Sequence, residues 1–179
     1  KIYINFLDDV KIMINTYSLF ALPVTHCKFP IPLSLHKKII LFVENNYNKK
    51  ENFIKRSCVK GFQFHDDFDG KKELVNNLNT FLSINFNLKI YHSWLNVLGD
   101  DSYNKPHVHS GDEVTHSGVF YLSSENNNIH FARDSDTFEI KPTLFDFLIF
   151  PYHLLHYVLP ENRMEKRICF AFNLEKIKK

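Results

Sequence analysis

From about residue 88 onward, apolar residues alternate with other residues in steps of two. The stretch Ile90-Tyr91-His92-Ser93-Trp94-Leu95-Asn96-Val97 shows this spacing. Because successive side chains of a strand point to opposite faces, such alternation indicates a half-buried strand. Further short strands are expected at about 115–123, 128–133, 136–140, 146–150, 156–159 and 166–174, separated by turn residues and by Pro142, Pro151 and Pro160. Many short strands without an internal repeat predict a β-sandwich or jelly roll.

The first half of the chain has a different pattern. Ser34 is a candidate cap for a helix that runs to about residue 46, and a second helix is expected over about 71–84, both from apolar residues at helical spacing. Extended structure is expected at about 17–28 and a strand at 62–67. The fold class is therefore expected to be α+β, mainly β, with two N-terminal helices packed on a jelly roll.

The chain has 179 residues, which suggests one domain over 1–179, with 1–87 as a supporting region and 88–175 as the core. This length is sufficient to bury a core. The net charge of +2 gives no bulk attraction for phosphate, so nucleic acid is not indicated as a partner. The oligomeric state cannot be derived from the sequence.

Three cysteines, Cys27, Cys58 and Cys169, are widely spaced and form no CxxC motif. This disfavours a disulfide framework and is typical of a reducing compartment, so we expect a cytoplasmic protein. No apolar run has the length of a membrane span, and no signal peptide of the usual pattern is present. The chain begins at Lys1, which leaves a preceding segment open.

The motif Pro106-His107-Val108-His109 precedes an apolar strand. In an extended chain, residues i and i+2 share a face, so His107 and His109 can direct their imidazoles to one point. Two such imidazoles suit a transition metal such as iron, copper, nickel or zinc. The best candidate for a third ligand is His156, in the segment Phe150 to Val158.

Arg167 lies in the apolar segment Lys166-Arg167-Ile168-Cys169-Phe170-Ala171-Phe172-Asn173. An arginine is seldom buried without an anionic partner. This position therefore predicts a carboxylate, from the protein or from a ligand.

Several other residues have weaker signals. His65 with Asp66 and Asp67 could form an alternative metal cluster, although a turn before a helix explains these acids equally well. Trp94 is expected in the core, and Arg133 is a candidate on the substrate side. Gly118 is expected to allow close approach of a neighbouring backbone. His116 and His153 are expected to lie outside the ligand set.

The segment 94–173 resembles the core of the iron(II)/2-oxoglutarate-dependent oxygenases, and most of all a small group common in marine bacteria and their phages. With an upstream patch, the likeness extends over about residues 17–174. The residues that carry it, in order along the chain, are Gly61-Phe62-Gln63, Ser93-Trp94-Leu95-Asn96, Pro106-His107-Val108-His109, Ser117-Gly118-Val119-Phe120-Tyr121-Leu122, Phe150-Pro151 with His156 and Pro160, and Arg167 with Ala171-Phe172-Asn173.

The resemblance implies a double-stranded β-helix, a cupin-like jelly roll, that holds Fe(II) with the cosubstrate 2-oxoglutarate. His107 and His156 match two iron ligands of the family. The acidic ligand position falls on His109, so either His109 or a carboxylate of Asp112 or Glu113 completes the set. We favour His109, because its i+2 placement requires no rearrangement of the loop.

In the same family, a basic residue at the position of Arg167 binds the far carboxylate of 2-oxoglutarate. A planar guanidinium can bind a carboxylate through two parallel hydrogen bonds. Asn96 and Tyr121, on strands flanking the ligand strand, are further candidates for holding the cosubstrate. The activity implied is hydroxylation of an unidentified small molecule or peptide, with release of succinate and CO2.

Two alternatives remain open from the sequence. A cupin-like metal enzyme could use three histidines without 2-oxoglutarate. A jelly roll could also serve as a non-catalytic binding protein, which predicts no retained metal. The substrate itself cannot be derived, because one fold supports many functions.

Overall fold

The computed structural model describes residues 2–6, 10–19, 21–47, 57–124, 127–162 and 164–178, which form two helices and two antiparallel sheets. Along the chain the elements are β1 (Ile2–Phe6), β2 (Val10–Leu19), β3 (Leu22–Lys28), α1 (Leu33–Asn46), β4 (Cys58–Val59), β5 (Phe62–Phe64), α2 (Lys71–Phe86), β6 (Leu88–Leu98), β7 (Tyr103–His107), β8 (His116–Tyr121), β9 (Ile129–Arg133), β10 (Asp136–Ile140), β11 (Asp146–Pro151), β12 (Leu155–Val158) and β13 (Arg167–Lys176). The expectation of a mainly β protein with two helices in its first half is confirmed.

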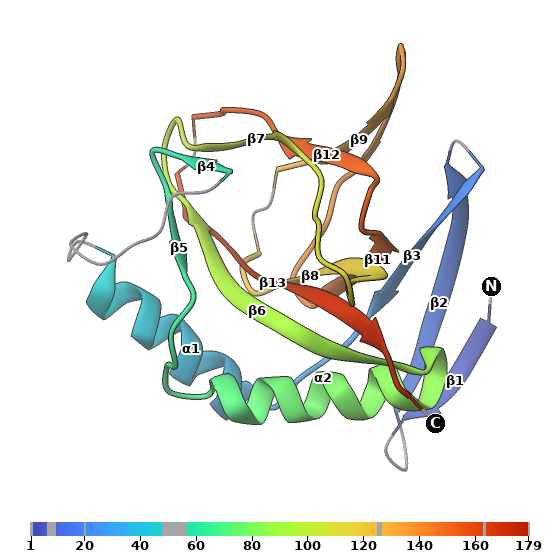
Figure 1. The fold of residues 1–179 in the computed structure, drawn as a ribbon. Coiled ribbons are helices and arrows are strands. Elements are labelled where there is room, and N and C mark those ends of the chain that lie inside the picture. Colours follow the sequence, from blue (N-terminus) through green and yellow to red (C-terminus); the bar gives the residue numbers. More distant parts are fainter. Residues whose placement is uncertain are drawn as a thin grey trace.

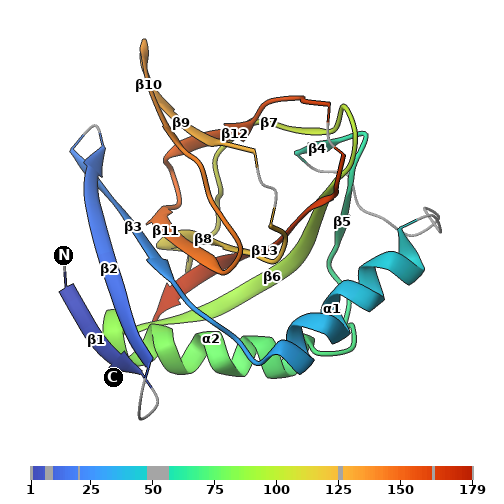
Figure 2. The ribbon, with the colours of Figure 1, turned by 180° about the vertical axis from the view of Figure 1, so that it is seen from behind.

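The large sheet has the strand order β1-β2-β3-β11-β8-β13-β6-β5, and the small sheet has the order β10-β9-β12-β7-β4. The helices cover the outer face of the large sheet, and the small sheet lies on the opposite side (Figures 1 and 2). Strand β3 pairs with β11, so N-terminal strands extend the sheet that the second half of the chain builds. Neither α1 nor α2 combines the length and hydrophobicity that a membrane-spanning helix requires, and these are the helices of the described residues.

Alternation along β13 divides its side chains between two cores. Phe170, Phe172 and Leu174 pack in the cluster that joins the large sheet to the helices. Cys169 belongs to the second cluster, which contains residues of both sheets and therefore lies between them. Burying a phenylalanine contributes about 1.5–3 kcal/mol, so the helix-facing side anchors the strand. Arg167 and Asn173 alternate in step with Cys169 and are left on the face toward the small sheet.

Strand β8 alternates between the two faces in the same way, and it contains a glycine where it pairs with β13. Gly118 pairs with Phe172 in register. A Cβ atom at Gly118 would lie 2.1 Å from the ring of Phe172. The expected close approach is therefore present, but the neighbour is an aromatic side chain and not a backbone segment.

Several boundaries differ from the predictions. Helix α1 begins at Leu33 with Pro32 as its N-cap, and no side chain caps it, so the role expected for Ser34 is wrong. Helix α2 continues to Phe86 and ends where Asn87 adopts a left-handed conformation (φ 55°). The extended region at 17–28 comprises the end of β2 and all of β3, which pair as a hairpin. The strand expected over 62–67 ends at residue 64. The connection between β8 and β9 lies partly outside the described residues, because 125 and 126 are not described.

Candidate active site

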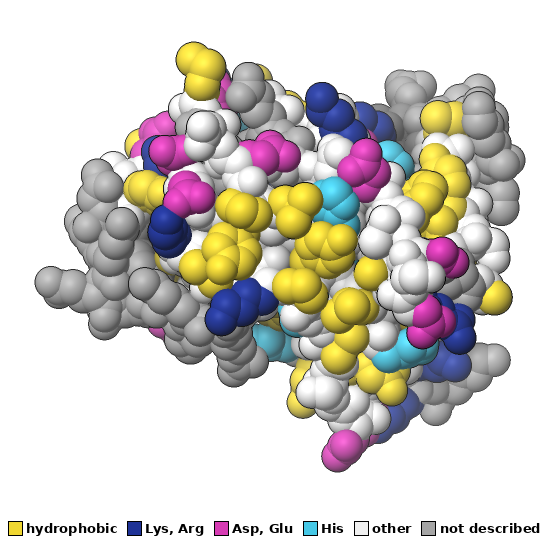
Figure 3. Space-filling view, turned by 90° about the horizontal axis from the view of Figure 1, so that it is seen from above, with side chains coloured by type: hydrophobic (Ala, Val, Ile, Leu, Met, Phe, Trp, Pro, Cys, Tyr) yellow, Lys and Arg dark blue, Asp and Glu magenta, His cyan; other side chains and the backbone are white. Residues whose placement is uncertain are grey.

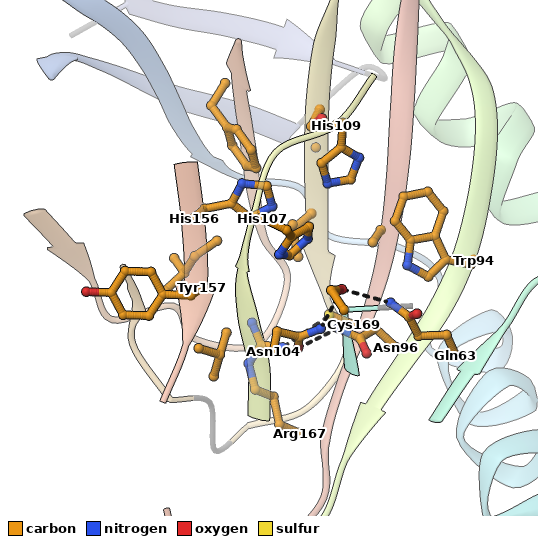
Figure 4. A pocket seen from close by; sticks show the side chains of 18 residues that line it. Gln63, Trp94, Asn96, Asn104, His107, His109, His156, Tyr157, Arg167 and Cys169 are labelled. Carbon is orange, nitrogen blue, oxygen red and sulfur yellow. Dashed lines mark hydrogen bonds between the residues drawn. The ribbon is translucent and has the colours of Figure 1, made fainter. Parts of the chain in front are cut away.

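Three histidines from two neighbouring strands of the small sheet come together. Strand β12 pairs with β7 so that His156 lies opposite His107. His109 follows the end of β7, where its backbone N–H donates to the carbonyl of Tyr152 at 2.9 Å. The ring centroids of His107 and His156 are 4.3 Å apart. The ring centroid of His109 lies 5.3 Å from that of His107 and 5.1 Å from that of His156. Each imidazole offers a nitrogen within 4.8 Å of the others, an arrangement suited to one metal ion (Figure 4).

Each of these imidazoles has an oxygen acceptor beside its Nδ1 atom. The acceptors are the carbonyl of Lys105 for His107 at 2.7 Å, the carbonyl of Leu154 for His156 at 2.9 Å and the side-chain Oδ1 of Asn173 for His109 at 2.6 Å. An oxygen acceptor requires the proton on Nδ1, which leaves the lone pair on Nε2 available. Hydrogen bonding of the second ring nitrogen is the usual way in which proteins orient metal-binding histidines.

Burial lowers the pKa of all three imidazoles. The pKa of His107 falls through burial, against the effect of the Lys105 carbonyl. The pKa of His109 falls to about 4, through burial and then through the charge of His107. That of His156 falls well below its ordinary value, again through burial first and then through the other two histidines. The group is therefore neutral near pH 7, the state in which imidazole binds a metal.

The acidic alternatives lie elsewhere. Glu113 forms an ion pair with Lys178 at 3.1 Å on the surface, and Asp112 is exposed. Among the described residues, the metal-competent group consists of the three histidines without a carboxylate. His116 and His153 lie outside this group, as expected.

Arg167 lies at the start of β13 and is buried, with an exposed fraction of 1%. It lines a cavity that the three histidines also line. One terminal nitrogen donates to the hydroxyl of Tyr121 at 3.3 Å, and the other donates to the sulfur of Cys169 at 3.3 Å. Its Nε atom is buried and has no hydrogen-bond partner, and no described carboxylate lies within ion-pair distance. The sequence predicted an anionic partner for Arg167, and among the described residues no carboxylate takes this place.

The guanidinium of Arg167 also lies over the ring of Tyr121, with its carbon 5.0 Å from the ring centroid. Burial raises the pKa of the Tyr121 hydroxyl, so this residue stays neutral and can both donate and accept a hydrogen bond. Tyr121 is fully buried and does not line the cavity itself, so it reaches the cavity only through its contact with Arg167.

Asn96 belongs to a chain of polar side chains on the cavity wall. Its amide nitrogen donates to Asn104 at 3.0 Å, Asn104 donates to the hydroxyl of Ser57 at 3.2 Å, and Gln63 donates to the same hydroxyl at 3.4 Å. The Oδ1 atom of Asn96 is buried without a hydrogen-bond partner. In this arrangement the Oδ1 atom of Asn96 is an unused acceptor on the cavity wall.

The three histidines and Arg167 line one narrow cavity with a volume of about 30 Å³ (Figure 4). A second hollow of about 370 Å³ shares His107, His109 and Trp94 with it and opens to the surface. We call this second hollow the outer groove. The site thus has a narrow inner cavity lined by Arg167 and the histidines, and an open groove beside the same histidines.

The sequence did not identify several residues of this site. Trp94, expected in the core, lines both the cavity and the groove, and its ring stacks on that of His109 at 5.7 Å. His65 forms a hydrogen bond with His92 at 3.0 Å in the outer groove, so the alternative cluster of His65 with Asp66 and Asp67 does not form. For His92 and Trp94 the sequence showed only alternation along β6, which cannot distinguish a cavity wall from a packed core, and His65 lies just after the end of β5.

Arg133 was expected on the substrate side. It lies exposed at the end of β9 and lines neither the inner cavity nor the outer groove. The structure therefore does not support the role expected for Arg133.

From above, over the small sheet, hydrophobic side chains gather between scattered charged groups (Figure 3).

No protein-family model and no curated protein matches this sequence. Solved structures match the fold. A prolyl-4-hydroxylase from Pseudomonas putida is 12% identical, with a TM-score of 0.68 over 89% of this chain and 95% of that chain. A prolyl hydroxylase from Trichoplax adhaerens, in complex with a peptide fragment of the oxygen degradation domain of hypoxia inducible factor, is 14% identical, with a TM-score of 0.66 over 86% and 83%.

HygX from Streptomyces hygroscopicus, with nickel, 2-oxoglutarate and hygromycin B bound, is 10% identical, with a TM-score of 0.63 over 86% of this chain and 82% of that chain. At these identities the likeness establishes a shared fold. The three-histidine group of this chain lies within that fold.

Proposed function

We propose that this protein is an iron(II)- and 2-oxoglutarate-dependent oxygenase that hydroxylates a small molecule or a peptide. The observation that carries the proposal is Arg167, a guanidinium buried in the same cavity as three metal-competent histidines without a carboxylate partner among the described residues. Burying a cation without an anion is unfavourable. A dicarboxylate that reaches from the metal to Arg167 would supply the missing charge.

In this proposal His107, His109 and His156 hold Fe(II) through their Nε2 atoms. Three protein ligands leave positions for a bidentate 2-oxo acid and for dioxygen. Iron and cosubstrate supply the oxidising chemistry: 2-oxoglutarate and O2 become succinate and CO2, while one oxygen atom enters a C–H bond of the substrate. The protein supplies binding, orientation and exclusion of water.

Arg167 and Tyr121 would hold the far carboxylate. The guanidinium has its Nε free, and Tyr121, which does not line the cavity, would support this role through its hydrogen bond with the guanidinium. Asn96, the third residue predicted for the cosubstrate, donates one of its two amide N–H groups to Asn104, so the second N–H would be the group that contacts the cosubstrate.

We further propose that the two sheets form a double-stranded β-helix, and that the chain belongs to the small group from marine bacteria and phages. The facing antiparallel sheets and the likeness to the prolyl hydroxylases and HygX support the first point. The order and spacing of the sequence motifs support the second. The extent of the domain over 1–179 and its division near residue 88 stay predictions.

The outer groove is the proposed substrate site. Its size falls in the range of small-molecule pockets. His65, His92 and Trp94 form one side, and Lys105, Pro106 and Val108 are also part of the lining. No aspartate or glutamate is among the described residues that line it. This composition favours a neutral or anionic substrate over a cationic one.

The test is an anaerobic titration of the Fe(II)-loaded protein with 2-oxoglutarate, monitored by the weak visible charge-transfer band of the chelate. A band that is present in the wild type and absent in His107→Ala supports the proposal. Glu113→Gln serves as the matched control, because Glu113 pairs with Lys178 outside the site, and it should keep the band.

The second candidate is a metal enzyme that uses three histidines without 2-oxoglutarate. The absence of a carboxylate from the described metal-competent group favours it. Bound iron without the band, together with metal-dependent turnover in the absence of 2-oxoglutarate, would establish this second candidate. Failure to retain any metal would leave a non-catalytic binding protein.

A further inference from the structure

Trp94 is the single tryptophan of the chain, and its indole N–H is buried without a hydrogen-bond acceptor among the described residues. The side chain lies on the inward face of β6 and is 7% exposed. Buried donors in folded proteins are nearly always paired, and an unpaired donor beside a cavity indicates a partner that enters the cavity. The indole N–H is therefore a candidate contact for a ligand.

The indole of Trp94 lies next to His109, at the end of the cavity where the three histidines meet. Its ring stacks on the imidazole of His109, with centroids 5.7 Å apart and planes at 22°. Figure 4 shows the indole nitrogen on the side of the ring that faces the cavity, toward Asn96 and Cys169. A ligand group that reaches His109 from Arg167 passes along this wall.

The question for this wall of the cavity is which side chains can donate a hydrogen bond to a 2-oxo acid. All oxygens of a deprotonated 2-oxo acid are acceptors, so they require donors. Asn96 donates one amide N–H to Asn104, and its Oδ1 atom is an unused acceptor. The Nδ1 protons of the three histidines are engaged by oxygen acceptors. The indole N–H of Trp94 is thus a buried donor on this wall for which the described residues offer no acceptor.

We propose that the indole N–H of Trp94 donates a hydrogen bond to a carboxylate or keto oxygen at the metal-binding end of the 2-oxo acid. This assignment rests on the proposed function, since it requires a 2-oxo acid between Arg167 and the histidines. Trp94 and Arg167 then hold the two ends of the cosubstrate, and the ring of Trp94 separates the cosubstrate from the outer groove, which it also lines.

The first experiment uses the single indole resonance of the ¹⁵N-labelled protein. The protein is loaded with diamagnetic Zn(II) and titrated with 2-oxoglutarate, and the indole N–H is followed by ¹H–¹⁵N correlation spectroscopy. Formation of the hydrogen bond should move the indole proton downfield with the same saturation as calorimetric binding. An indole resonance that does not move while 2-oxoglutarate binds would overturn the assignment without any mutation.

The second experiment compares Trp94→Phe with Tyr91→Phe by calorimetric titration of the zinc-loaded proteins with 2-oxoglutarate. Trp94→Phe keeps an aromatic ring but removes the donor, and should weaken binding about tenfold or more, as expected for a hydrogen bond to an anion. Tyr91 lies on the same strand, is 57% exposed and lines neither the inner cavity nor the outer groove, so its variant should bind as the wild type does.

The outcomes separate the two proposals. If the wild type does not bind 2-oxoglutarate, the proposed function and the role of Trp94 both fall. If the wild type binds and Trp94→Phe binds equally well, only the role of Trp94 falls. Zinc affinity, measured on each variant, should be unchanged. A loss of zinc affinity in Trp94→Phe would overturn the assignment and would mean that Trp94 positions the imidazole of His109.

Discussion

Replacing Arg167 by methionine should stabilise the ligand-free protein and strongly weaken its affinity for 2-oxoglutarate. The guanidinium is buried, lacks a carboxylate partner among the described residues and leaves Nε unpaired. Methionine keeps much of the aliphatic stem and removes the charge. Because the same group is unfavourable without ligand and favourable with it, the substitution should change stability and binding in opposite directions.

The magnitudes follow from the contacts of Arg167. Replacing buried charged groups by well-packed apolar ones gains about 1–4 kcal/mol. Loss of the 3.3 Å hydrogen bond to Tyr121 removes about 1 kcal/mol of this gain. The free energy of unfolding should therefore rise by up to about 3 kcal/mol. Truncating one side of a buried charge pair costs about 2–5 kcal/mol, so affinity for 2-oxoglutarate should fall between about 30-fold and several thousand-fold.

The assay is urea unfolding of the metal-free protein, combined with calorimetric titration of the metal-loaded protein. Adding Tyr121→Phe to the variant removes the hydroxyl left without its partner and should raise stability further. Arg133→Met is the matched control for binding, because Arg133 is exposed outside both the cavity and the groove, and it should leave the affinity for 2-oxoglutarate unchanged. A destabilisation above about 2 kcal/mol in both Arg167 variants would refute the reasoning, since it would mean that the guanidinium is satisfied within the protein.

Three further predictions concern the histidines and the sheet. His156→Ala should weaken metal binding by more than about 100-fold in a chelator competition, whereas Glu113→Gln should leave it unchanged; equal affinities would remove His156 from the ligand set. Gly118→Ala should cost about 1–3 kcal/mol of unfolding free energy in urea, because its Cβ would lie 2.1 Å from the Phe172 ring. Adding Phe172→Leu should recover part of this loss, and a neutral Gly118→Ala would contradict the predicted clash. The pKa of His109 is lowered to about 4 from 6.5, so the unfolded chain binds a proton in this interval that the folded chain does not. Stability of the metal-free protein should thus be complete above pH 6.5 and fall toward pH 4 in urea titrations, and a pH-independent curve would argue against the burial of this imidazole.

Much of the fold follows from patterns that are local in the chain. The alternation along β13 separates Phe170 and Phe172, which face the helices, from Cys169, which lies between the sheets. The same alternation accounts for the strands of the second half and for a sheet with two different faces. Boundaries are less well determined, as at Ser34, because local propensity does not decide which residue caps a helix.

The candidate site was predictable where two functional residues are close in sequence. His107 and His109 are two positions apart, and the structure brings them together with His156. The sequence also showed that Arg167 requires an anion. It could not show that the described protein residues supply none, since this depends on every side chain around the guanidinium.

The sequence by itself determined which residues alternate between two faces, where the helices lie and which motif could bind a metal. The tertiary structure decided which of those faces encloses a cavity. It paired β12 with β7 so that His156 lies opposite His107, and it placed Trp94 beside His109 on the cavity wall. Alternation arises from the geometry of one strand, whereas the meeting of polar groups depends on pairings between strands that are distant in sequence.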